Sequence, residues 1–164
     1  PEDRQRMGLV TEFKAHENLI FGYHHQEPYS KNSILQEKEI MSFSKKVMEE
    51  YDVRPRSPNL MTSNFSGGNQ QKIILSRELN ENPKVLLIGQ PTRGVDIGAI
   101  EFIHQRLIDM RDKGAAILLV SVELEEVLSL SDRIVVMFDG NIVGEKVNKD
   151  VTDRDLGLLM AGVA

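Results

Sequence analysis

The spacing of apolar residues changes near residue 80 of this 164-residue chain. Before that point apolar positions recur at helical intervals, and residues 36–51 are predicted to form one such helix. After it, the runs at 85–88 and 116–120 are short and continuously apolar, as in strands buried on both faces of a parallel sheet. The segment 97–113 between them predicts the crossover helix. The pattern therefore predicts an α/β fold in which a helical part precedes a β-α-β unit.

Turn and breaker residues delimit the other predicted elements. A short helix over 17–21 ends at Gly22, and a polar loop follows over 23–33. The remaining elements are predicted as helices at 69–79, 123–130 and 153–160 and as strands at 133–138 and 141–147, with a hairpin turn at Asp139-Gly140 between the strands. We expect three parts: a helical lobe (11–80), an α/β core (81–150) and a C-terminal tail (151–164).

Composition and charge narrow the possible partners. The formal net charge of −5 argues against nucleic acid, because cationic side chains supply most of the affinity for phosphate backbones. The chain has no cysteine, which excludes disulfides and thiolate metal sites. Its longest apolar runs fall far short of the roughly 20 residues that span a bilayer. The chain starts with Pro-Glu-Asp-Arg and without Met, so we expect it to be a piece of a longer protein.

The most specific segment is Ser-Gly-Gly-Asn-Gln at 66–70, directly before a predicted helix. Ser66 can cap that helix, while Gly67 and Gly68 allow the backbone to approach an anion. Unpaired N–H groups and the helix dipole favour negative charge there, as a terminal phosphate would supply. Taken alone, such a turn is more often only a helix cap.

The downstream sequence favours the phosphate interpretation. Residues 83–96, Pro-Lys-Val-Leu-Leu-Ile-Gly-Gln-Pro-Thr-Arg-Gly-Val-Asp, form a predicted strand and a tight loop. This order resembles ABC ATPases, in which a signature motif precedes the Walker B strand and the D-loop. Within that family the chain resembles the second cassette of tandem proteins that import simple sugars and nucleosides, and 17–19 and 131–134 fit the same subgroup. The resemblance implies a truncated P-loop NTPase sheet with an inserted helical lobe.

The chain departs from the family pattern at three positions. The resemblance places a Walker B Asp and a catalytic Glu where this chain has Gly89 and Gln90, and a switch-loop His where it has Val122. A glycine cannot hold the metal, and an amide cannot accept a proton as a carboxylate does. The phosphate-binding loop is also missing, since Gly-Lys occurs nowhere in the chain. We therefore expect a degenerate site of its own and no activity from this segment alone.

Other family roles fall on residues that are intact. The resemblance implies that two cassettes pair head to tail, so Ser66, Gly67, Gly68 and Gln70 would contact the ATP of the partner cassette. Asp96 would lie at the same interface in the D-loop, and it can equally cap the helix that starts at residue 97. Glu2 would occupy the Q-loop position.

The expected cofactors are ATP and Mg in the full transporter, with no metal site and no tight nucleotide binding in this segment. The implied partners are the other cassette, transmembrane permease subunits and, indirectly, a solute-binding protein, at the cytoplasmic face of the membrane. The alternative is a non-transport ABC protein or a regulatory dimerisation module, which a basic face or coiled-coil arms would support.

The histidines and the aromatic residues of the lobe receive simpler interpretations. The four histidines, including His104, are expected on the solvated surface. Phe13, Phe21 and Tyr23 are expected in the core rather than in a groove for a permease helix.

Overall fold

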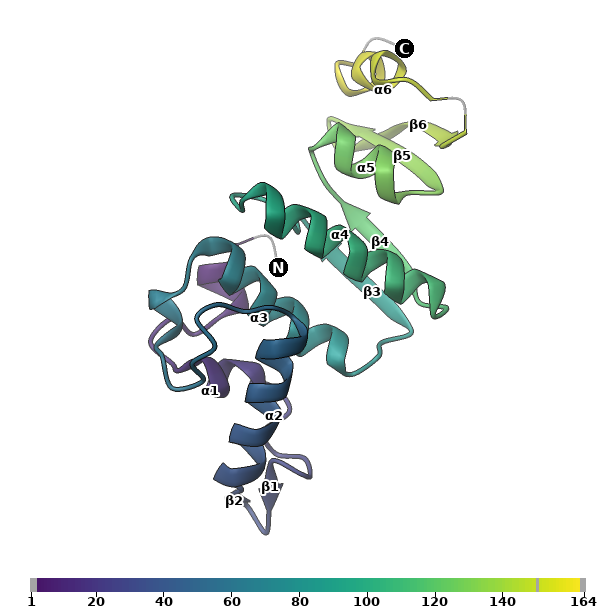
Figure 1. Ribbon diagram of the computed structural model, residues 1–164. Helices are drawn as coiled ribbons and strands as arrows, with labels where there is room; N and C mark the ends of the chain where they lie inside the picture. The colour runs from purple at the N-terminus through teal and green to yellow at the C-terminus, as the bar shows by residue number, and fades with distance from the viewer. Residues whose placement is uncertain (1–2, 150, 163–164) are drawn as a thin grey trace.

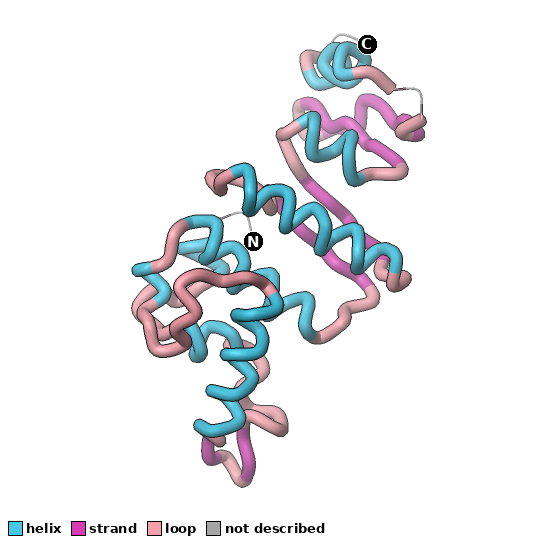
Figure 2. Tube along the Cα trace, viewed as in Figure 1, coloured by secondary structure: helices cyan, strands magenta, loops and turns pink. Residues whose placement is uncertain are grey.

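The computed structural model describes residues 3–149 and 151–162, and it has an α/β architecture in which helices dominate the first half and β3 to β6 follow in the second (Figures 1 and 2). The elements in chain order are η1 (Arg4–Gly8, a π-helix), α1 (Ala15–Leu19), β1 (Ser30–Lys31), β2 (Ile34–Leu35), α2 (Glu37–Glu50), η2 (Thr62–Asn64, a 3-10 helix), α3 (Gly67–Asn80), β3 (Val85–Gly89), α4 (Ile97–Asp112), β4 (Ala116–Val120), α5 (Leu124–Leu130), β5 (Arg133–Phe138), β6 (Asn141–Val147) and α6 (Asp153–Met160).

The structure confirms the predicted helices and strands to within two residues at each end. The predicted hairpin turn is also confirmed, since Asp139 and Gly140 both have positive φ, at 46° and 74°. One hairpin was missed inside the predicted loop 23–33, where β1 and β2 are joined by Asn32 and Ser33. Both of these residues have positive φ, at 52° and 63°, but two-residue strands are too short to leave a period-two signal.

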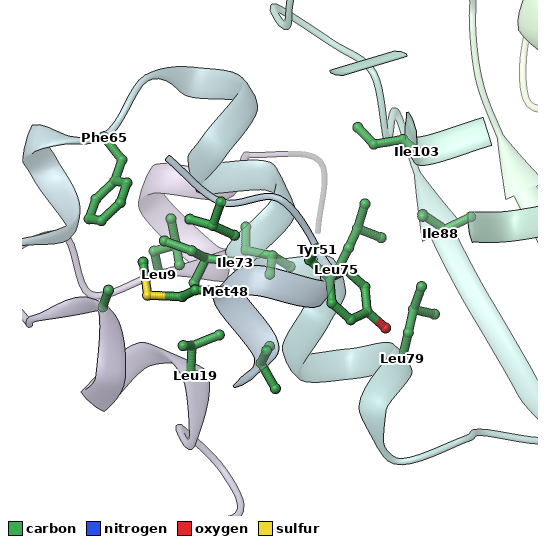
Figure 3. Packing of buried hydrophobic residues seen from close by; sticks show 14 of the residues in the cluster. Leu9, Leu19, Met48, Tyr51, Phe65, Ile73, Leu75, Leu79, Ile88 and Ile103 are labelled. Atoms are coloured by element: carbon green, nitrogen blue, oxygen red, sulfur yellow. The ribbon is translucent and has the colours of Figure 1, made fainter. Parts of the chain in front are cut away.

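Helix α3 is the central element of the larger hydrophobic core. Its side chains Ile73, Leu75 and Leu79 are buried against α1 and α2 on one side and against β3 and α4 on the other (Figure 3). Leu19 of α1 and Met48 of α2 pack into the same cluster. Because one continuous core includes the helical lobe and the first strands, the position of α3 relative to β3 is fixed by apolar packing.

Strands β3 and β4 form a parallel pair with α4 as the crossover. Leu86 and Ile88 are buried in the core, but the alternate residues of both strands point away from it. The relative exposures are 64% for Val85, 73% for Leu87, 60% for Leu118 and 60% for Val120. The prediction that both faces are buried is therefore wrong for the described residues, which cover one face of this pair. A continuous apolar run indicates that both faces of a strand can be buried, but it does not show which segments pack against each face.

A second, smaller core lies at the C-terminal end. The antiparallel hairpin β5–β6 packs Ile134 and Val136 against Leu156 of α6, with side chains of α5 beside them. This unit lies at the opposite end of the molecule from the β1–β2 hairpin (Figure 1). None of the helices that the structure describes has the length and the apolar character required to span a bilayer.

The aromatic residues of the lobe do not follow the prediction. Phe13 and Phe21 are 40% and 46% exposed, with their rings edge-to-face at 6.4 Å between centroids, so the expectation of core positions is wrong for both. Tyr23 is half-buried and packs against a small cluster of Ile20, Tyr29 and Ile40. Phe13 and Phe21 lie in the loops on either side of α1 rather than in the helix, so helical spacing does not predict their burial.

Candidate functional site

The start of α3 has the predicted capped geometry. The Ser66 hydroxyl oxygen accepts a hydrogen bond from the Asn69 backbone N–H at 3.4 Å and another from the Asn69 side-chain amide at 2.9 Å. The Gln70 N–H donates to the Ser66 carbonyl at 2.8 Å and closes the first turn. The cap prediction for Ser66 is confirmed, and the first N–H groups of α3 have no carbonyl partner within the helix.

Other parts of the chain approach the two glycines closely. A Cβ atom on Gly67 would lie 2.5 Å from Nη2 of Arg4 and 3.0 Å from the Gly94 carbonyl oxygen. A Cβ atom on Gly68 would lie 2.9 Å from Oδ2 of Asp96. The glycines therefore allow the loop 90–96, which joins β3 to α4, to pack directly against the start of α3.

Gln70 is buried and holds this region together from inside. Its amide donates to the Thr62 carbonyl at 3.1 Å and its carbonyl accepts from the Gln5 side chain at 3.1 Å. Ser66, by contrast, is exposed and Gly67 is partly exposed. Of the residues predicted to contact a partner's nucleotide, Ser66 and Gly67 therefore lie at the surface, while Gly68 and Gln70 lie behind them.

Asp96 caps α4, because its Oδ1 accepts from the Ala99 N–H at 2.9 Å. This confirms the cap role, while the interface role stays a prediction. A cavity of about 350 Å³ lies between the starts of α3 and α4, and its lining residues are Asp52, Arg54, Gly68, Asn69, Lys72, Asp96, Gly98 and Ala99. A hydrogen bond from Arg54 at 2.8 Å lowers the pKa of the Asp52 carboxyl from its ordinary value. The cavity thus has both cationic and anionic walls.

The three predicted degenerate positions meet at the carboxyl ends of β3 and β4. Gly89 pairs with Val120, the Gln90 N–H donates to the Val120 carbonyl at 2.8 Å, and the Val122 N–H lies 3.5 Å from Oε1 of Gln90. A Cβ atom on Gly89 would meet no atom within 4 Å, so packing among the described residues does not require glycine there. This edge is where parallel α/β sheets generally bind ligands. The side chains at these three positions include no carboxylate and no imidazole, so they supply no general base.

The loop 90–96 connects this edge to the start of α3. Arg4 donates from Nη1 to the Arg93 carbonyl at 2.6 Å and from Nη2 to the Gly94 carbonyl at 3.1 Å. Sequence reasoning missed Arg4, because a contact spanning some 90 residues leaves no local pattern. Glu2, the predicted Q-loop residue, lies outside the described residues.

Sequence reasoning also missed a buried polar cluster that includes Thr92 of the loop 90–96. Glu126 of α5 is 3% exposed, and its Oε1 accepts from the Thr92 hydroxyl at 2.8 Å and lies 3.1 Å from Nε2 of His104. His104 is only 21% exposed and His16 is also partly buried, with Nδ1 2.9 Å from the Pro58 carbonyl oxygen, so neither is the fully solvated side chain that was predicted. His24 and His25 are exposed, as predicted. Among the described residues no three His, Cys, Asp or Glu side chains group as metal ligands.

Comparison with known proteins places the chain beside import ATP-binding proteins. No family model matches it. Over 99% of its length it is 46% identical to the guanosine import ATP-binding protein NupO of Bacillus subtilis and 48% identical to the nucleoside import ATP-binding protein NupA of Lactococcus lactis. Over 98% of its length it is 35% identical to the ribose import ATP-binding protein RbsA of Streptococcus agalactiae. The chain spans 32% of the length of each of these relatives.

Solved structures establish the fold. A dimeric ATP-binding cassette in a post-hydrolysis state with ADP and Pi matches 90% of the chain and is covered over 62% of its own length, with a TM-score of 0.69 and 24% identity. A nucleotide-free cassette from an ABC transporter matches 93% of the chain, with a TM-score of 0.68 and 24% identity. The chain therefore has the α/β fold of ATP-binding cassettes, and the predicted fold class is confirmed. The predicted likeness to nucleoside and sugar import ATP-binding proteins is also confirmed, whereas the second-cassette position and the truncation stay predictions.

Proposed function

We propose that this chain is a segment of an ATP-binding protein that energises nucleoside or sugar import. In this proposal the start of α3 completes the ATP site of a partner cassette, while the chain's own site at the ends of β3 and β4 is degenerate. The observation that carries the proposal is the contrast between these two places. The first has a capped, glycine-lined helix start at the surface, and the second has Gly89, Gln90 and Val122 where its chemistry would need a metal ligand and a base.

Ser66 and Gly67 are the residues best placed to contact a partner's ATP. The Ser66 oxygen already accepts two hydrogen bonds from Asn69, so its O–H is the part that remains to donate to a phosphate oxygen. The N–H groups at the start of α3 and the helix dipole add attraction for an anion, on the order of 0.3–1 kcal/mol from the dipole at an exposed site. The Mg ion of the composite site would neutralise phosphate charge and would be held by residues of the partner cassette.

The buried residues would set the geometry of this surface. Gln70 links α3 to Thr62 and to Gln5 by hydrogen bonds. Gly68 has no side chain, so Asp96 can pack against the start of α3. Positioning of this kind matters in phosphoryl transfer because most of the catalysis there comes from orientation and electrostatic stabilisation. We place Asp96 at the interface with the partner cassette, beside the nucleotide.

The remaining partners follow from the relatives named above. We propose that permease subunits dock on the helical lobe at the exposed side chains Phe13, Phe21 and Met61, with Lys14 and Met61 joined by a backbone bridge. Exposed apolar side chains grouped in this way are typical of protein contact sites. The protein would then work at the cytoplasmic face of the membrane, with a solute-binding protein acting through the permease.

ATPase measurements on the full-length transporter test the proposal. Gly68→Asp places a carboxylate against Oδ2 of Asp96, behind the Ser66 and Gly67 surface. This should displace the start of α3 from the partner's phosphates, and we expect ATP turnover to fall on the order of tenfold or more, about 1.4 kcal/mol in barrier. Gln90→Ala should change turnover less than twofold, because no base is lost. Gly157→Asp is the matched control, since a Cβ atom at this helical glycine would meet no atom within 4 Å.

Thermal melting of each variant separates lost activity from lost folding. Ser66→Ala is a second, smaller change at the same surface, and it should lower turnover without adding volume. If Gln90→Ala reduces turnover as much as Gly68→Asp does, the edge of β3 and β4 is catalytic and the proposal is wrong.

A further inference from the structure

The carboxylate of Glu126 is a costly group in the interior of this fold. It is 3% exposed, and of its two oxygens Oε1 receives the Thr92 hydroxyl at 2.8 Å and approaches Nε2 of His104 at 3.1 Å. Oε2 is buried and has no hydrogen-bond partner among the described residues. Leaving a buried polar oxygen without a hydrogen-bond partner is destabilising, and more so when the group is charged. Packing alone therefore gives no reason for a carboxylate at this position.

The three side chains of this cluster come from three different elements. Glu126 lies on α5, His104 on α4 and Thr92 in the loop 90–96. The Glu126 carboxylate therefore ties the middle of that loop to two helices. Thr92 is itself 6% exposed, so its hydroxyl has little access to water as a substitute partner.

One end of the loop 90–96 contacts the carboxyl end of β4, and the other end contacts the start of α3. At its start, the Gln90 N–H donates to the end of β4, where the loop 121–123 leads into α5. At its other end, the Gly94 carbonyl is bound by Arg4 beside Gly67, and Asp96 lies against Gly68. A shift of α5 that moves Glu126 would thus act on a loop that borders both signature glycines.

We propose that Glu126 is a positioning residue that couples α5 and the loop 121–123 to the start of α3 through its hydrogen bond from Thr92. Its functional meaning rests on the proposed role of the α3 start in serving a partner's nucleotide. Movement at the carboxyl ends of β3 and β4 then reaches Gly67 and Gly68 through the loop 90–96. The coupling element is a buried side-chain hydrogen bond between parts of the chain 34 residues apart.

Hydrogen exchange on the full-length protein without nucleotide tests the coupling directly. Thr92→Val keeps the shape of the side chain and removes the donor, and we expect exchange to speed at least threefold in peptides covering 90–96 and 67–75. Glu126→Ala should produce the same pattern. Glu126→Gln should stay near wild type, because the amide oxygen still accepts from Thr92. Glu125→Ala is the matched control, since Glu125 is an exposed neighbour on the same helix.

A merely structural role predicts a different result. Faster exchange confined to α5 in Glu126→Ala, or wild-type exchange of 67–75 in Thr92→Val, overturns the proposal. If Glu126→Ala does not fold, the test relies on the other two variants: exchange in 67–75 should be faster in Thr92→Val and near wild type in Glu126→Gln. In the transporter, Thr92→Val should lower kcat for ATP at least threefold with KM changed less than twofold. An unchanged kcat also overturns the coupling if Gly68→Asp is inactive, because the start of α3 then serves the ATP site.

The outcome is separable from that of the proposed function. Exchange without nucleotide depends only on the coupling inside this chain, whereas Gly68→Asp reports whether the α3 start serves an ATP site. Coupled exchange with an active Gly68→Asp variant would remove the proposed function and leave the coupling. If Gly68→Asp is inactive and exchange in 67–75 does not change in Thr92→Val, the coupling is wrong and the proposed function stands.

Discussion

Arg106 of α4 links the helical lobe to the α/β core, and its removal should weaken that link measurably. Its Nη2 donates to the Glu50 carbonyl at the end of α2 at 2.6 Å. The guanidinium carbon lies 4.8 Å from the ring centroid of Tyr51 and 5.1 Å from that of Phe102, which belong to the lobe and to α4 respectively. One side chain therefore makes a charged hydrogen bond and one ring contact between the core and the lobe, and a second ring contact within α4.

The expected loss in Arg106→Ala is about 2 kcal/mol in the free energy of unfolding. A hydrogen bond from a charged donor is worth about 1.5–3 kcal/mol. Because the Arg106 side chain is 26% exposed, each ring contact belongs near the lower end of the cation–π range, about 0.5 kcal/mol. These contributions do not simply add, and alanine recovers a small part through its better helix propensity.

Urea unfolding of the chain followed by circular dichroism provides the measurement. With a slope of about 2 kcal/mol per M, the loss appears as a midpoint lower by about 1 M. Arg111→Ala is the matched control, because Arg111 lies on the same helix, is 42% exposed and pairs with its neighbour Asp112. It should change the free energy of unfolding by no more than about 0.5 kcal/mol. Equal losses in the two variants would show that Arg106 does not hold the lobe to the core.

Two further outcomes are expected for the isolated chain. It should show no steady ATP turnover in a phosphate-release assay with Mg-ATP, because Gly89 and Gln90 stand where a metal ligand and a base are needed, and turnover above a heat-denatured control would contradict this. It should also self-associate at micromolar concentration, because the exposed apolar face with Leu87 and Leu118 favours pairing, and Leu87→Lys should shift light scattering toward the monomer. A wild-type chain that runs as a monomer would refute the second expectation.

The sequence determined the elements whose signals are local. Ser66 and Asp96 cap α3 and α4 where the pattern predicted, and Asp139-Gly140 forms the predicted hairpin turn. These features depend on interactions within a few residues, so residue type and spacing are sufficient to predict them. The family resemblance implied that Gly89, Gln90 and Val122 belong to one site. The structure brings them to one edge because parallel strands joined by a helix have their carboxyl ends together.

Tertiary structure decided which side of each element is covered and which distant groups meet. The sequence did not reveal that Val85 and Leu87 face outward while Phe13 and Phe21 remain exposed. Nor did it reveal that Glu126 is buried while Glu125 is exposed, although the two carboxylates are adjacent. Burial depends on which segments pack against an element, and those segments come from distant parts of the chain. A polar side chain such as Glu126 therefore acquires its role only when folding places Thr92 and His104 beside it.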